Sequence, residues 1–201
     1  MLRIYRIPFS TNVERVALAL GHKGLEVEWM DVDPADRSEV ERISGQPLVP
    51  VLVEGDDVVT DSTAILRYLE EKTPYPRLWP HDQARRAELD VFLDWFNRVW
   101  KVPPNAIEAA RAQGNADTSE LEQELSASRD VFEHLLADRE YLFGEFSAAD
   151  CVAFPFLKYG LVYDEADDEE FHLILREHLA LGGRYPRLEA WIRRVDEHPR
   201  A

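Results

Sequence analysis

The sequence is poor in the residues from which disulfides and metal sites are built. Its 201 residues include a single cysteine, Cys151, so it forms no internal disulfide and no cysteine-based zinc site. The six histidines are scattered, with no His-x-His or His-x-x-x-His pair, which is typical of surface and helix-end positions. We therefore expect no metal centre.

Basic residues are scarce as well: 23 Lys and Arg stand against 39 Asp and Glu, a formal net charge of −16. A surface of this sign repels nucleic-acid phosphates and anionic lipid headgroups, which argues against both as partners unless the basic residues gather in one patch. The sequence also lacks a secretory leader at its start and any apolar run of membrane-spanning length. We therefore expect a cytoplasmic protein. The 45% of residues that are hydrophobic predict a substantial core.

The first third of the chain alternates between strand and helix patterns. Period-two alternation predicts strands at residues 2–7, 25–31, 49–53 and 58–59. Apolar residues at helical spacing predict helices that begin after Ser10 and at Asp61, with a weaker helix at 35–43. The order βαβ–ββα makes the first strand pair parallel and the last antiparallel, which predicts a small mixed four-stranded sheet.

From residue 73 onward the pattern is helical. Residues 73–80 contain three prolines, which indicates a stiff linker. We therefore predict an α/β domain at 1–73, a linker at 74–83 and an all-helical domain at 84–201. Within the latter, the prolines at 103–104 should stop one helix, and Ser147 and Asp150 have the spacing of a capping box at the start of a buried helix.

Three places in the first domain carry residues suited to binding or catalysis. Ser10 lies between a strand and a helix, where helix amides favour an anion such as a thiolate; the alternative is that Ser10, Thr11 or Asn12 simply caps the helix. Val49–Pro50 is a candidate cis peptide that would turn the backbone of Val49 outward toward an extended peptide; the alternative is a trans proline at the start of an edge strand.

The third place is Asp61–Ser62, at the start of another helix. The hydroxyl and the helix amides favour a carboxylate, and the Asp61 side chain favours an ammonium group. Together they suit the end group of an α-amino acid, although a pair of capping residues is the ordinary explanation.

The order and spacing of these segments resemble the glutathione transferase superfamily. Residues 10–16, Ser-x-Asn-x-x-Arg-Val in outline, resemble its serine-type active-site segment, closest to the plant phi-like form. Residues 49–52 resemble its cis-proline strand, residues 61–65 its acid-Ser-x-Ala-Ile segment, and Ser147 with Asp150 its capping box. The resemblance covers the whole chain. It implies a thioredoxin-like domain followed by a helical bundle, a homodimer, and glutathione as co-substrate without a tightly bound cofactor.

The resemblance also implies roles for individual residues. Ser10 would donate a hydrogen bond to the sulfur of glutathione and lower the pKa of its thiol, and Asn12 would assist or hold the turn. Val49 would pair its backbone with the cysteinyl unit, and Pro50 would fix that geometry.

The remaining roles concern the two ends of glutathione. Asp61 and Ser62 would bind the γ-glutamyl ammonium and carboxylate. Arg37 is a candidate for the glycyl carboxylate, with an ordinary solvated side chain as the alternative. The second substrate would be an apolar electrophile, with candidate walls in Trp95, Phe96, Trp100 and Tyr159, although most aromatic residues in helical stripes belong to the core.

The sequence departs from the family pattern before the cis-proline strand. Gln46 lies two positions earlier than the usual glutamine, so a contact of its side chain with glutathione is in doubt. Residues 44–50 are similar to a glutaredoxin loop, but glutaredoxins require a cysteine where Ser10 stands, which excludes thiol–disulfide exchange through the protein's own cysteine.

Several functions fit these features. The first is a glutathione transferase that conjugates the thiolate to a small electrophile. A glutathione-dependent isomerase, peroxidase or dehalogenase fits the same scaffold, as does a non-catalytic protein-binding or ligand-binding module or the use of another small thiol. The acidic run at 164–170 is read as a solvated loop and helix start.

Overall fold

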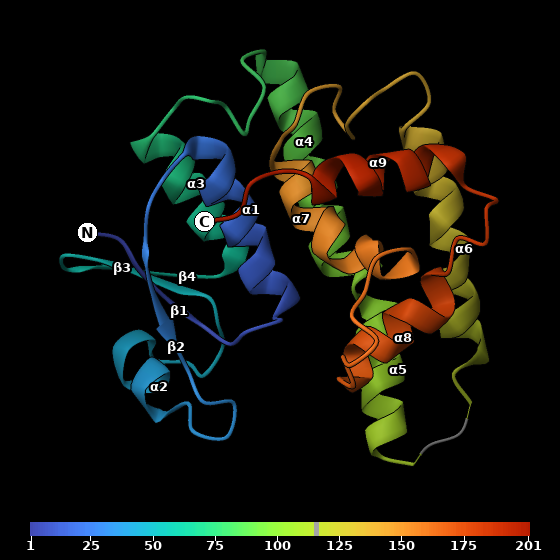
Figure 1. Ribbon diagram of the computed structural model, residues 1–201, viewed down its shortest axis with the longest axis horizontal. Coiled ribbons are helices and arrows are strands. Elements are labelled where there is room, and N and C mark those ends of the chain that lie inside the picture. Colours follow the sequence, from blue (N-terminus) through green and yellow to red (C-terminus); the bar gives the residue numbers. More distant parts are fainter. Residues whose placement is uncertain (115–116) are drawn as a thin grey trace. The chain divides into compact units, whose positions relative to one another are not determined.

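The computed structural model describes residues 1–114 and 117–201, which form two compact units. Unit 1 comprises Met1–His81 together with His198–Ala201, and unit 2 comprises Asp82–Glu197 (Figure 1). The sequence placed a linker at 74–83 and everything after it in the helical domain. In the structure the division lies between His81 and Asp82, and the last four residues group with unit 1 because they pack along its first helix.

The sheet of unit 1 has four strands in the order β2-β1-β3-β4. The strands are β1 (Arg3–Arg6), β2 (Glu28–Asp31), β3 (Val51–Glu54) and β4 (Asp57–Thr60). β1 is parallel to β2 and antiparallel to β3, and β3 is antiparallel to β4. This mixed sheet confirms the predicted βαβ–ββα architecture.

Three helices cover the sheet: α1 (Thr11–Lys23), α2 (Ser38–Ser44) and α3 (Ser62–Lys72) (Figure 1). Side chains alternate between the faces of a strand. Tyr5, Val51 and Val53 pack with Val40 of α2, whereas Ile4 and Leu52, one position along, are fully buried toward the other face. α1 packs beside α3, and Gly24 ends α1 in the left-handed conformation, with φ of 62°.

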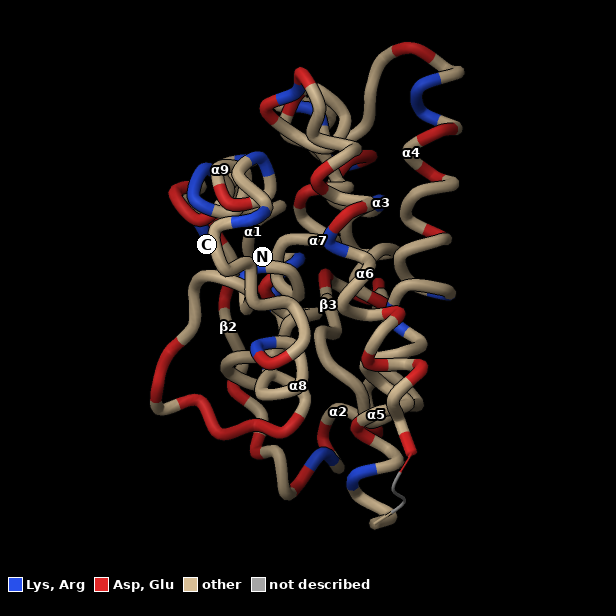
Figure 2. Tube along the Cα trace, turned by 90° about the vertical axis from the view of Figure 1, so that its right-hand side faces the viewer, with Lys and Arg blue, Asp and Glu red and all other residues tan. Residues whose placement is uncertain are grey.

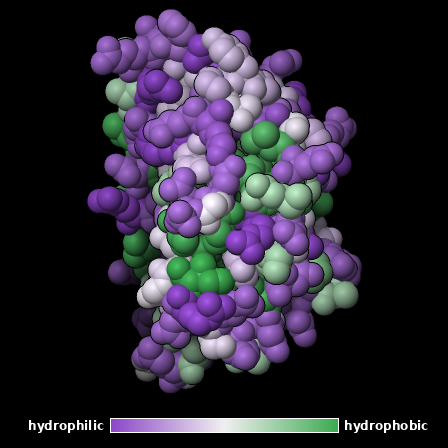
Figure 3. All heavy atoms as spheres, turned by 90° about the vertical axis from the view of Figure 1, so that its left-hand side faces the viewer, coloured by the Kyte–Doolittle hydropathy of each residue, from purple (hydrophilic) through white to green (hydrophobic). Residues whose placement is uncertain are grey.

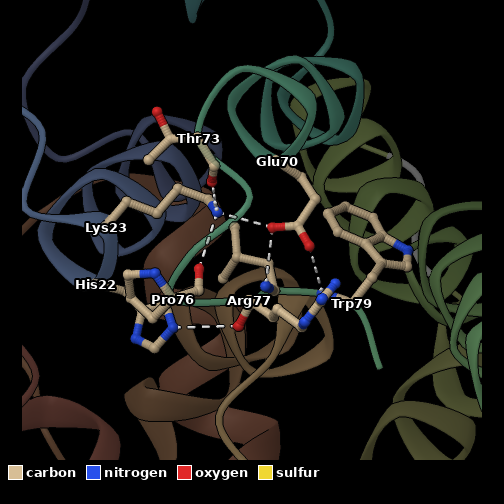
Figure 4. Close-up of polar contacts among 8 residues, drawn as sticks. His22, Lys23, Glu70, Thr73, Pro76, Arg77 and Trp79 are labelled. Atoms are coloured by element: carbon tan, nitrogen blue, oxygen red, sulfur yellow. Dashed lines mark hydrogen bonds and ion pairs between the residues drawn. The ribbon is translucent and has the colours of Figure 1, made fainter. Parts of the chain in front are cut away.

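A buried ion pair joins α1, α3 and the segment that follows α3 (Figure 4). Lys23 Nζ lies 2.7 Å from Glu70 Oε2 and also donates to the carbonyl oxygens of Thr73 (2.6 Å) and Pro76 (3.0 Å). Glu70 accepts in turn from two backbone amides further along, at 2.9 and 3.3 Å. The proline-rich segment is therefore held against α1 and α3 by hydrogen bonds between its backbone and the two charged side chains.

The regular elements of unit 2, in its described residues, are helices. Its elements are α4 (Gln83–Trp95), η1 (Phe96–Trp100), α5 (Val102–Ala112), α6 (Ser119–Leu135), α7 (Ala148–Leu157), η2 (Lys158–Gly160), α8 (Glu170–Leu179) and α9 (Pro186–Asp196). Every residue of α7 is buried. The capping box predicted at its start is present: Asp150 accepts from the backbone and hydroxyl of Ser147, both at 2.9 Å, and also from Leu142 N (3.0 Å) and Trp191 Nε1 (2.8 Å).

The prediction that the prolines at 103–104 stop a helix is confirmed. α4 passes into a π-helical turn, η1, that ends at Trp100, and a new helix, α5, begins at Val102 with prolines in its first positions. Prolines are tolerated there because the first amides of a helix have no intrahelical acceptor. α4 packs on α7, whereas α5 packs on α6 and α8.

Acidic residues outnumber basic ones along the chain trace, and the segment before α8 is almost continuously acidic (Figure 2). Most of residues 164–170 are exposed, although Asp167 Oδ2 lies 2.8 Å from His172 Nδ1. In the described part of the chain, none of the helices has both the length and the hydropathy needed to cross a membrane.

Candidate functional site

Ser10 occupies the junction between β1 and α1. It is the N-cap residue of α1 in position and is half-buried, but its side chain makes no capping hydrogen bond within the described chain. Phe9, directly before it, is 76% exposed and has a φ of 69°, a conformation that is costly for a bulky residue and is found mostly where function requires it. The hydroxyl thus lies at the positive end of α1 without being used as the helix cap.

The second helix start, at Asp61 and Ser62, uses its residues differently. Asp61 has a φ of 70° and caps α3, since its Oδ1 accepts from Thr63 N (2.9 Å) and Ala64 N (3.0 Å). The ordinary explanation, a helix cap, therefore holds for this aspartate. Both bonds use Oδ1, and the side chain is otherwise exposed, so a cation could still approach Oδ2.

Arg15 joins the two helix starts, and sequence reasoning assigned it no role. It is 1% exposed, and its Nη1 donates to Ser62 Oγ at 3.2 Å. An arginine is rarely so buried without partners, and here it brings a fixed positive charge beside a hydroxyl that is itself 5% exposed. This bond ties the first turn of α3 to α1 across 47 residues of sequence.

The loop before β3 is organised by Gln46. Its Oε1 accepts from Leu48 N at 2.6 Å, and its Nε2 donates to Leu48 O at 3.0 Å. The Val49–Pro50 peptide bond that follows is cis, in agreement with the resemblance. Gln46 therefore supports the loop from within, while Leu48 is 64% exposed.

Two other predicted residues lie apart from these contacts. Arg37 is the residue before α2, is half-buried, and donates from Nε to Pro34 O at 3.3 Å. Asn12 lies half-buried in the first turn of α1. These positions neither support nor contradict a contact of either residue with glutathione.

The aromatic residues proposed as walls divide into two pairs. Trp95 and Trp100 line a pocket of about 260 Å³ within unit 2, together with Val99, Pro103, Glu124, Leu125, Ala127, Ser128 and Val131. Phe96 is fully buried and stacks on Trp100 with ring centroids 4.4 Å apart. Tyr159 is 4% exposed and stacks on His172, so neither of these two lines the pocket.

Apolar side chains are also exposed on unit 1. On the face of the molecule drawn in Figure 3, hydrophilic residues predominate and hydrophobic residues form patches between them. The large hydrophobic residues of this unit with the greatest exposure are Met1, Phe9, Tyr75 and Leu48. Phe9 and Leu48 flank the candidate residues Ser10 and Val49 in the sequence.

Both units match known families. Residues 4–77 match the family model described as the N-terminal domain of glutathione S-transferase, and residues 99–199 match that of the C-terminal domain. The chain belongs to the glutathione S-transferase family. The serine-type resemblance drawn from residues 10–16, 49–52 and 61–65 is thereby confirmed at the level of the superfamily.

Curated relatives carry the same family name. Glutathione S-transferase F10 of Arabidopsis thaliana is 32% identical over 174 residues, covering 79% of this chain and 80% of the relative. Glutathione S-transferase Z1 of the same plant is 42% identical over 91 residues, 43% of this chain. That match spans 41% of the relative's length.

Solved structures share the fold over nearly the whole chain. A glutathione S-transferase of Rhodospirillum rubrum is 26% identical with a TM-score of 0.73, covering 99% of this chain and 89% of the other. A β-etherase of Sphingobium sp. strain SYK-6 superposes with a TM-score of 0.81 at 23% identity, covering 98% and 96%. At that identity the likeness concerns the fold alone.

Proposed function

We propose that the protein is a glutathione transferase that conjugates the thiolate of glutathione to a small apolar electrophile. The observation that carries the proposal is the pair of helix starts in unit 1, α1 at Ser10 and α3 at Ser62, which Arg15 joins through a buried hydrogen bond. Both starts favour negative charge, and glutathione offers a thiolate and a γ-glutamyl carboxylate.

In this proposal the sulfur binds at Ser10. The hydroxyl donates to the sulfur and the amides of the first turn of α1 add their dipole, so the thiol pKa falls from about 8.5 toward neutrality. The larger thiolate fraction then attacks the electrophilic carbon, and the leaving group departs with the electron pair of the broken bond. Asn12 assists at the same turn.

The rest of glutathione extends away from α1. The hydroxyl and the backbone amide of Ser62 bind the γ-glutamyl carboxylate, with Arg15 supplying charge behind the hydroxyl. Asp61 Oδ2 binds the ammonium group. The backbone of Val49, set by Pro50, pairs with the cysteinyl unit, and Arg37 is the candidate for the glycyl carboxylate.

The proposal extends to the electrophile and the assembly. The electrophile contacts unit 2, where Trp95 and Trp100 offer an apolar wall. The protein acts in the cytoplasm as a homodimer, so sedimentation should give a species of about twice 23.2 kDa. An isomerase, peroxidase or dehalogenase reaction is the alternative on this scaffold, and a non-catalytic binding module is the alternative to catalysis.

Calorimetric titration with reduced glutathione tests the proposal. We expect binding that Asp61→Ala abolishes. Asp82→Ala is the matched control, because Asp82 caps α4 in the same way, accepting from Arg85 N at 3.0 Å, and each substitution removes a helix cap worth about 1 kcal/mol. If both variants lose binding equally, the loss is structural and the role of Asp61 is wrong.

Turnover of a chlorodinitrobenzene separates catalysis from binding. Ser10→Ala should lower kcat/KM by about 10- to 100-fold near neutral pH, because the thiol pKa returns toward its value in water. Since the Ser10 hydroxyl makes no capping bond, the variant should keep the stability of the original. Ser119→Ala, at the exposed start of α6, is the control. Unchanged turnover of Ser10→Ala would refute the role of Ser10.

A further inference from the structure

Residues 198–201, here called the tail, lie along α1. The backbone amide of Ala201 donates to the carbonyl oxygen of Ala17 at 3.3 Å. Arg200 reaches Glu14 Oε1 with two nitrogens, Nε at 3.2 Å and Nη2 at 3.1 Å. The side chains of this ion pair are 29% and 16% exposed, so solvent screens it less than a fully exposed pair.

The other half of the tail fits closely against the last turn of α1. A Cβ atom at Gly21 would lie 2.0 Å from the carbonyl oxygen of Pro199, so this approach requires glycine. The rings of His22 and His198 lie 6.4 Å apart, and burial lowers the pKa of both below the ordinary histidine value. Both rings are therefore neutral at pH 7, and the tail meets no repulsion at this end.

Arg200 contacts Glu14, which lies in the first part of α1, near the end of the helix at which Ser10 lies. Glu14 is four residues after Ser10 and its amide donates to Ser10 O at 3.0 Å. Side chains of a helix lean toward its N-terminus, so the Glu14 carboxylate covers the turn that begins at Ser10. A negative charge there opposes a thiolate bound at Ser10.

We propose that Arg200 neutralises Glu14 and thereby tunes the charge at the start of α1 in favour of the glutathione thiolate. The inference rests on the proposed function and adds a positioning residue to it. Two other charged groups at these helix starts are Arg15, which is buried against Ser62, and Asp61, which caps α3. The tail thus connects the far end of the sequence to the ionisation of the bound thiol.

The experiment measures the pKa of glutathione bound to the protein, from the ultraviolet absorbance of the thiolate across pH. Arg200→Gln should raise that pKa by about half a unit to one unit. The thiolate fraction and kcat/KM below that pKa should then fall by about 3- to 10-fold. Binding of the γ-glutamyl end, measured by calorimetry at a pH where the thiol is protonated, should change little.

Two further variants separate charge from structure. Arg200→Gln combined with Glu14→Gln removes both charges and should return the thiol pKa to that of the original protein. Arg193→Gln is the control, because Arg193 forms an ion pair of similar length, 3.0 Å, with Glu189 of the same helix, α9, in unit 2; it should leave the pKa unchanged.

The outcomes are distinguishable. If the original protein binds no glutathione, this inference falls with the proposed function. If it binds glutathione and Arg200→Gln leaves the thiol pKa unchanged, only the role of Arg200 is overturned. A double variant that keeps the shift of Arg200→Gln would also overturn it, because the effect would then come from lost packing of the tail.

Discussion

The ion pair between Lys23 and Glu70 should be among the most sensitive points of unit 1. Its side chains are 0% and 8% exposed. The three hydrogens of the Lys23 ammonium are matched by three acceptors: Glu70 Oε2 and the carbonyl oxygens of Thr73 and Pro76 (Figure 4). Lys23→Met keeps an unbranched side chain of similar length but removes all three bonds and leaves the Glu70 carboxylate uncompensated.

The expected loss follows from that geometry. Removing one partner of a buried pair costs about 3–5 kcal/mol, because the remaining charge has lost its water without keeping its counter-charge. Glu70 retains two amide donors, at 2.9 and 3.3 Å, which places the expected loss at the lower end, about 3 kcal/mol. Adding Glu70→Gln to Lys23→Met should recover about 1 kcal/mol or more, since the stranded charge is gone.

Urea unfolding followed by far-ultraviolet circular dichroism measures the free energy of unfolding. Hydrogen exchange at the amides of α3 should show that the loss of stability falls on unit 1. Lys72→Met is the matched control. Lys72 pairs with Glu54 at the surface, with side chains 45% and 22% exposed, and its loss should cost less than about 1 kcal/mol. If Lys23→Met costs no more than Lys72→Met, the buried pair is not stabilising the unit as argued.

Two more predictions concern Asp150 and Gly21. Burial raises the pKa of Asp150 to about 6, above its value in the unfolded chain, so the folded state binds the proton more tightly. The stabilising contribution of this proton is nearly complete at about pH 3, below the unfolded pKa, and is lost as pH rises through 6. Relative to Asp150→Asn, the original protein should therefore lose about 3 kcal/mol between pH 3 and pH 7, measured by urea unfolding at each pH, and parallel curves for the two proteins would contradict this. Gly21→Ala gains about 1 kcal/mol of helix propensity but places a Cβ 2.0 Å from the Pro199 carbonyl oxygen. The tail should therefore detach from α1, which hydrogen exchange would detect as faster exchange at the amide of Ala201. Unchanged exchange would show that the backbone adjusts instead.

The elements of the first unit were predictable because they depend on local patterns. Alternation placed each strand within a few residues of its observed range. The helical spacing of Val13, Val16, Ala17 and Leu20 predicted α1, in which Ala17 is half-buried and the other three are buried. The helix predicted at 35–43 is observed at Ser38–Ser44. It begins later because the residues before it form turns, in which the side chains of Asp33 and Asp36 accept hydrogen bonds from the amides of Ala35 and Ser38.

The contacts that build the candidate site were not predictable in the same way. Arg15 reaches Ser62 across 47 positions, and Arg200 reaches Glu14 across 186. A single sequence shows which residues can form an ion pair but carries no record of which ones meet. The nearest signal was Arg15 itself, an arginine directly before the apolar run Val16–Leu20 of α1, where burial requires partners.

The π turn between α4 and α5 has a consequence for the helical unit. It widens one turn of an otherwise continuous run of helix and so acts as a one-residue spacer. Each residue of an α-helix advances about 100° around the axis, so this spacer rotates everything after Trp100 relative to α4. One stretch of chain can then present apolar side chains to α7 before the turn and to α6 and α8 after it. Removing a single residue from Phe96–Trp100 would leave the composition almost unchanged, yet it would turn Ile107, now fully buried, away from its neighbours.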